Sequence, residues 1–208
     1  MTEAEWSQSA DFIAMLKSLA GRITARKGRL FACASSGRLL PMLDDERSRQ
    51  AIALALRLAD NPADDEVRRR AYVAANAVGQ PSWDIDLYHC AAFTLYDDAG
   101  IRHWAAHVDH LGALQDEAVC GALALSRSDA VRLVRHFFGN PFREQSTPAG
   151  WPAVVVELAN ALYDGQDCGF AMHDLLYEVG QPELAGHFRA EEWHPKGCWV
   201  VDLVLGKE

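Results

Sequence analysis

The sequence predicts an all-α protein, a single-domain bundle of short antiparallel helices. Apolar residues recur at intervals of three and four through most of the chain, which is the spacing of one helix face. Prolines stand at the starts of these stretches and glycines at their ends, as they do in helices. One domain over residues 1–208 is the simplest organisation because no Pro-rich or Ser-rich linker divides the chain; subdomains 1–140 and 150–208 are the alternative.

The first helices are predicted from local signals. Thr2 with Glu5 three residues later matches a capping box, and apolar residues at helical spacing follow from Phe12 to Gly21. Glycine and proline interruptions then divide the chain at positions typical of helix ends. The next predicted helices cover 24–41, 45–61 and 64–79.

The middle of the chain combines helix-forming and strand-forming residues. Residues 84–97 are predicted as a helix, although Phe93, Thr94 and Tyr96 also suit a strand. Residues 101–125 follow as helix, which glycines divide.

Residues 131–143, VRLVRHFFGNPFR, form the segment around which the rest is arranged. Its helix stops on Gly139, and its run of apolar side chains is too long for a solvated surface, so it belongs to the core. Residues 199–205, WVVDLVL, suit either a strand or a helix, and we predict a helix because no partner strand is evident. The other C-terminal helices are predicted over 152–165, 168–180 and 182–188.

Charge and cysteine usage limit the partners and the location. Twenty Lys and Arg against 29 Asp and Glu give a net charge of −9, which repels nucleic acid and anionic membranes. The cluster Arg22, Arg26, Lys27 and Arg29 is predicted to be a solvated helix face. Five cysteines without a C-x-x-C pair, no basic leader and no apolar stretch of membrane-spanning length predict a cytoplasmic protein.

Four segments together resemble a known but uncharacterised protein family. RKGRLFACASSGRL, LDDERSRQAIALALRLAD, LVRHFFGNPFR and HPKGCWVVDLVLGKE are similar to planctomycete bacterial proteins that begin MTEAEW and end in a comparable GCW segment. The resemblance implies no established activity, cofactor or catalytic residue. Relatives often read CACCRR where residues 33–38 here read CASSGR, so no thiol metal site is expected there.

The first candidate metal site is His103, His107 and His110. Histidines four residues apart on a helix can chelate Zn²⁺ or a similar ion. Positions 103 and 110 are about 10 Å apart along a helix, so a site takes two of the three, with further ligands from another helix such as His89. A helical metal-binding protein or metal-dependent enzyme would use His103 and His107; the alternative is a solvated polar face.

The second candidate metal site is His187, His194 and Cys198, which lie in the part that resembles the family. A loop with the spacing H-x6-H-x3-C can fold around a tetrahedral structural zinc, with Cys168 or His173 as fourth ligand. The alternatives are a small buried thiol with surface histidines, or a nucleophilic Cys198 activated by His194 and Lys196.

The leading functional prediction is a non-enzymatic, cytoplasmic helical interaction module that presents an acidic surface to a protein partner. No P-loop, G-x-G-x-x-G or G-x-S-x-G motif is present, and no catalytic or organic-cofactor residue is predicted. Zinc is the cofactor predicted if either histidine site is formed.

Overall fold

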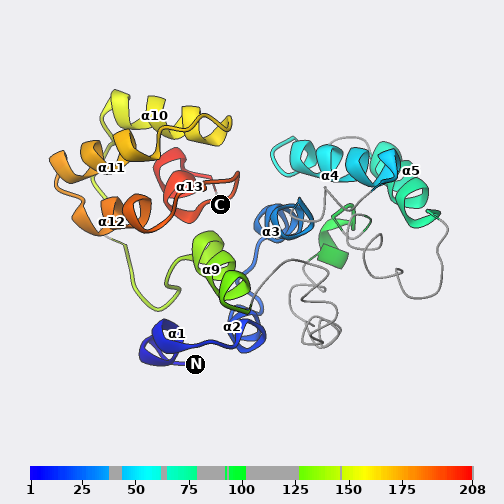
Figure 1. The fold of residues 1–208 in the computed structure, drawn as a ribbon, viewed down its shortest axis with the longest axis horizontal. Helices are drawn as coiled ribbons and strands as arrows, with labels where there is room; N and C mark the ends of the chain where they lie inside the picture. Colours follow the sequence, from blue (N-terminus) through cyan, green and yellow to red (C-terminus); the bar gives the residue numbers. More distant parts are fainter. Residues whose placement is uncertain are drawn as a thin grey trace. The chain divides into compact units, whose positions relative to one another are not determined.

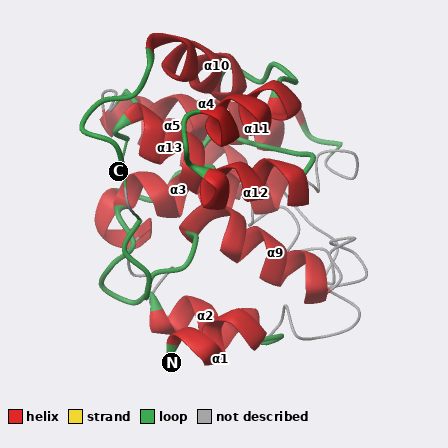
Figure 2. Ribbon diagram, turned by 90° about the vertical axis from the view of Figure 1, so that its left-hand side faces the viewer, coloured by secondary structure: helices red, strands yellow, loops and turns green. Residues whose placement is uncertain are grey.

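A computed structural model describes most of the chain (Figure 1). The described residues are 1–37, 44–61, 65–78, 92, 94–101, 127–145 and 147–207. Within them every regular element is an α-helix, as Figure 2 shows, which confirms the all-α prediction. Among these helices none is both long and apolar enough to cross a membrane.

The chain divides into two compact units, here named the N-terminal unit (Met1–Arg135) and the C-terminal unit (His136–Glu208). The boundary between the two units falls inside helix α9. The alternative prediction of subdomains 1–140 and 150–208 placed the boundary a few residues later, at 141–149. One domain over 1–208 stays a prediction.

The N-terminal unit contains all of the described helices before α9 and most of α9 itself. They are α1 (Glu3–Gln8), α2 (Phe12–Ser18), α3 (Ala25–Gly37), α4 (Glu46–Leu58), α5 (Asp65–Asn76) and α9 (Arg127–Phe138). The predicted capping box is confirmed: the Glu5 amide donates to Thr2 Oγ1 at 3.3 Å, and the Thr2 amide donates to the Glu5 carboxylate at 2.7 Å.

Helices α3, α4 and α5 enclose a core of mostly small side chains, which lets the helix backbones approach closely. Ile52 and Ala55 of α4 are buried in this core, whereas Val67, near the start of α5, is 46% exposed. The buried cluster consists of Cys33, Ala51, Ile52, Ala55, Leu58, Ala75, Ala92 and Leu95.

The prediction of a fully solvated basic face on α3 is wrong at Arg29. This side chain is buried, because its guanidinium donates to the Thr94 carbonyl at 2.8 Å and pairs with Asp98 at 3.1 Å. Arg26 is also engaged, in a 3.0 Å ion pair with Asp60.

Helix α9 has the buried character that its sequence predicts. Val131, Leu133, Val134 and Phe137 are all buried. Gly139 has a φ of 59°, a left-handed conformation that ends the helix at little cost for glycine.

The C-terminal unit is a cluster of four short helices that follow the end of α9 (Figure 1). They are α10 (Ala153–Tyr163), α11 (Gly169–Glu178), α12 (Pro182–Ala190) and α13 (Trp199–Leu205). The predicted helix at 199–205 is therefore confirmed. Apolar side chains from all four helices form one core, which includes Val155, Ala159, Leu162, Met172, Leu176, Leu184, Phe188, Val200 and Val201.

Candidate metal centre

Four metal-ligating side chains converge in the C-terminal unit. One ligand atom from each of His136, His187, His194 and Cys198 lies within 4.8 Å of all the others. Among the described residues this is the one group of three or more such side chains brought so close together. Three of the four were predicted as ligands from sequence; His136 was not.

A tight turn places His194 beside Cys198. The Cys198 amide donates to the Pro195 carbonyl at 3.0 Å, and the third residue of the turn, Gly197, has a φ of 93°. A type II turn requires positive φ at that position, and glycine adopts it without strain. As a result His194 Nδ1 lies 3.8 Å from Cys198 Sγ.

Helix α12 supplies His187 from its last turn. The imidazole follows the buried Leu184 by three positions and precedes the buried Phe188, so it stands at the edge of the apolar face of α12. Its Nε2 lies 3.1 Å from Cys198 Sγ.

Helix α9 supplies His136, which is 4% exposed. Its ring centroid lies 4.8 Å from that of His187 and 5.4 Å from that of His194. The end of α9 lies close to the first residue of α13. A Cβ added at Gly139 would lie only 2.9 Å from Cδ2 of Trp199, so the glycine allows this close approach. This close approach positions His136 next to the three ligands of the C-terminal segment.

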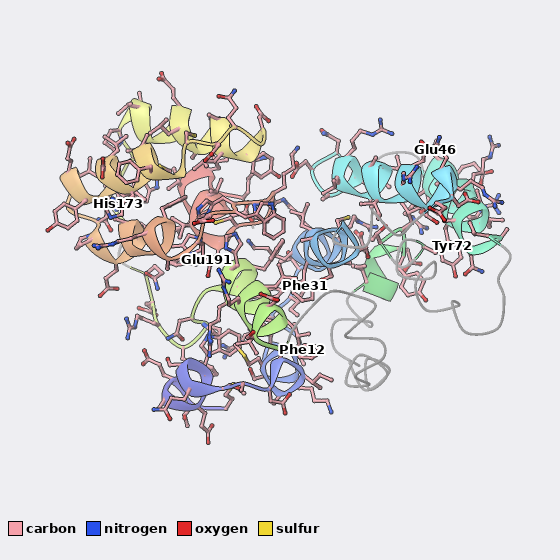
Figure 3. The ribbon with its side chains drawn as sticks, in the orientation of Figure 1. Phe12, Phe31, Glu46, Tyr72, His173 and Glu191 are labelled. Carbon is pink, nitrogen blue, oxygen red and sulfur yellow. The ribbon has the colours of Figure 1, made fainter. Side chains whose placement is uncertain are left out.

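Two of the imidazoles, His187 and His194, are in the form that binds metal. The Nε2–H of His194 donates to the Glu191 carbonyl at 2.9 Å, which leaves the Nδ1 lone pair directed at Cys198. Figure 3 labels Glu191, just beyond α12. Burial lowers the pKa of His187 well below 6.5, helped by His136 and His194, and burial also lowers the pKa of His194. Both rings are therefore neutral at neutral pH.

Aromatic side chains form the outer shell of the cluster. The Trp193 ring stacks on His136 at 6.1 Å, and Trp199 meets His187 edge-on at 5.7 Å. The Phe188 ring lies 4.5 Å from that of His194. An apolar shell of this kind restricts water and strengthens the bonds between ligands and a metal ion.

The geometry fits a tetrahedral zinc ion. Zn–N distances of about 2.0–2.1 Å and Zn–S of about 2.3 Å place ligand atoms roughly 3.3–3.6 Å apart. The His187–Cys198 and Cys198–His194 separations of 3.1 and 3.8 Å bracket that range. All four ligand atoms lie within 4.8 Å of one another, so the widest separations exceed that range by about 1 Å.

The side chains predicted to complete this site lie elsewhere. Cys168 directs its thiol to the Leu158 carbonyl at 3.7 Å, and His173 contacts Asp174 at 2.9 Å. Neither belongs to the cluster, and His136 takes the fourth position instead. No sequence pattern singles out His136, since it stands 51 positions before His187 inside an apolar helical run.

The other predicted ligands belong to the first candidate metal site. His103, His107, His110 and His89 lie outside the described residues, so a site built on them stays a prediction. Cys33, in the segment where no thiol metal site was expected, is buried and its pKa is raised to about 12 by burial.

The Gly169→Ala substitution tests whether the position of the His194 imidazole determines zinc affinity. A Cβ at this position would lie 3.3 Å from Cδ2 and Nε2 of His194, so Gly169→Ala would displace the imidazole. We expect zinc affinity to fall about tenfold, the usual effect of disturbing a group that orients a ligand. Competition with a chromophoric chelator measures it.

Gly186→Ala is the matched control, because a Cβ there would meet nothing within 4 Å. It should leave zinc affinity unchanged and stabilise α12 by up to about 1 kcal/mol. Equal zinc affinities for the two variants would show that Gly169 has no positioning role.

Comparison with protein families, with curated proteins and with solved structures gave no match for this chain.

Proposed function

We propose that the C-terminal unit binds one Zn²⁺ ion through His136, His187, His194 and Cys198, and that the ion has a structural role. The observation that carries the proposal is the convergence of the four ligand atoms within 4.8 Å, from residues spread over 63 positions of sequence. Three imidazoles and one thiol that face one another make a ligand set of the type that binds zinc.

The ligand set favours zinc. Three neutral imidazoles and one thiolate suit a borderline-soft ion, and the group contains no carboxylate, the ligand that Ca²⁺ and Mg²⁺ require. Four protein ligands also fill a tetrahedron, which leaves no open position for a water or a substrate. Closed sites of this type are structural, whereas catalytic zinc sites keep one position open.

The proposed ion would join the end of α9 to the segment from α12 to α13. A short unit buries a small core and depends on additional links for its stability. Zinc supplies such a link, because binding energy gained only in the folded state adds directly to folding stability.

Elemental analysis of purified protein tests the proposal. We expect about one zinc per chain in the wild-type protein, and loss of the zinc in His187→Asn. The His107→Ala variant should keep it, which separates this site from the other predicted histidine site. Absence of zinc after reconstitution, or loss of zinc in His107→Ala alone, would contradict the proposal.

The predictions of location, partner and kinship are independent of the proposed zinc site. A cytoplasmic location, a protein partner and kinship with the planctomycete family are supported by charge, cysteine usage and sequence motifs. A metal-dependent enzyme on His103 and His107 is the rival account, and the same metal analysis distinguishes it.

A further inference from the structure

Helix α11 has one buried face and one solvent-exposed face. Gly169, Met172 and Leu176 are buried in the core of the C-terminal unit. The opposite face has helical spacing of three and four residues, so its side chains lie in one row. This row, here named the α11 aromatic face, consists of Phe170, His173, Asp174, Tyr177 and Glu178.

Two aromatic rings of this face are largely exposed, and both stack on the half-buried His173 ring. Phe170 is 81% exposed and Tyr177 is 65% exposed, unusual values for large apolar side chains. The ring of Phe170 lies 6.3 Å from that of His173 at an interplanar angle of 28°, and His173 lies 6.4 Å from Tyr177 at 17°. Figure 3 labels His173 beside α11. Grouped exposed apolar side chains mark an interaction surface.

Negative charge accompanies these rings. Asp174 and Glu178 are exposed and lie one position beyond His173 and Tyr177. From His136 onward the chain has eleven Asp and Glu against four Lys and Arg. The face is therefore complementary to a partner that is both positively charged and able to stack on aromatic rings.

We infer that the α11 aromatic face docks an arginine-rich segment of a protein partner. A guanidinium group is planar and weakly hydrated, so it stacks on an aromatic ring and at the same time pairs with a carboxylate. The row offers both: Phe170 and Tyr177 supply ring faces, and Asp174, one oxygen of which contacts His173 at 2.9 Å, supplies a carboxylate between them. A lysine ammonium can pair with Asp174, but it lacks the planar surface for stacking.

Two other occupants fit the face less well. Nucleic acid is repelled by the acidic unit. A second copy of the chain would bring Asp174 and Glu178 against the same carboxylates of its partner, and like charges across an interface oppose binding. The inference does not depend on the proposed zinc site, since these side chains lie outside the four-ligand cluster.

Fluorescence anisotropy with a labelled peptide of alternating arginine and alanine tests the inference on the full chain. We expect saturable binding that weakens with salt, and about tenfold weaker binding for the double variant Phe170→Ala/Tyr177→Ala. The alternating lysine peptide should bind wild type more weakly than the arginine peptide. Both substitutions are on exposed side chains, and circular dichroism checks that each variant is folded.

Val154→Ala is the matched control, because Val154 is a 48% exposed apolar side chain on α10 of the same unit. It should bind the arginine peptide as wild type does. The inference is overturned if wild type does not bind the peptide, or if the double variant binds it as tightly as wild type. It is also overturned if sedimentation shows a wild-type dimer that the double variant dissociates, since the face would then join two copies of this chain.

Discussion

Replacing Cys198 with serine is expected to weaken zinc binding by at least about a hundredfold. The thiolate is the one anionic ligand in the group and lies within 3.8 Å of two imidazoles, so its loss affects the whole site. A serine hydroxyl has nearly the same size but stays protonated at neutral pH and is a poor ligand for zinc. Chelator competition measures the affinity directly.

Thermal unfolding provides a second readout for the same variant. Wild-type protein should melt at a lower temperature when a chelator removes the metal, whereas Cys198→Ser should melt at the same temperature with and without the chelator. Cys168→Ser is the control, because that thiol lies in the same unit but outside the cluster. Wild-type zinc affinity in Cys198→Ser, or weakened affinity in Cys168→Ser, would contradict the ligand assignment.

Replacing Gly139 with alanine is expected to lower the free energy of unfolding by about 2–4 kcal/mol. The residue has a φ of 59°, and its added Cβ would lie 2.9 Å from the Trp199 ring, so the substitution costs both backbone strain and overpacking. Because the same contact positions His136, zinc affinity should fall as well. Urea denaturation and chelator competition measure the two effects.

Gly180→Ala is the control that separates backbone strain from overpacking. Gly180 has a φ of 76°, but a Cβ there would meet nothing within 4 Å, so only the backbone term of about 1–2 kcal/mol applies. Its zinc affinity should equal that of wild type. Equal destabilisation by the two substitutions would mean that the approach of Gly139 to Trp199 contributes nothing to stability.

The helices could be predicted where local signals decide the structure. The capping box at Thr2 and the proline and glycine punctuation of the C-terminal unit depend on residues a few positions apart, and the structure confirms them. Arg29 was predicted wrongly because its burial depends on Thr94 and Asp98, more than 60 positions away. Long-range polar partners have no periodic signal in sequence.

The candidate site also has a part that local sequence predicts and a part that depends on long-range packing. His187, His194 and Cys198 lie within twelve positions of one another, so their spacing alone suggested a common site. His136 depends on how the end of α9 packs, and its neighbours on the helix are core residues. Phe170, by contrast, falls opposite the apolar stripe of α11, so the helical pattern contains the information that it is exposed.

The most direct test of the proposed zinc centre is X-ray absorption at the zinc edge of the reconstituted protein. The account predicts a four-coordinate shell with three nitrogen ligands at about 2.0–2.1 Å and one sulfur ligand at about 2.3 Å. That shell requires the three imidazoles and the single thiolate of His136, His187, His194 and Cys198. A shell without sulfur, or one with two sulfur ligands, would contradict it.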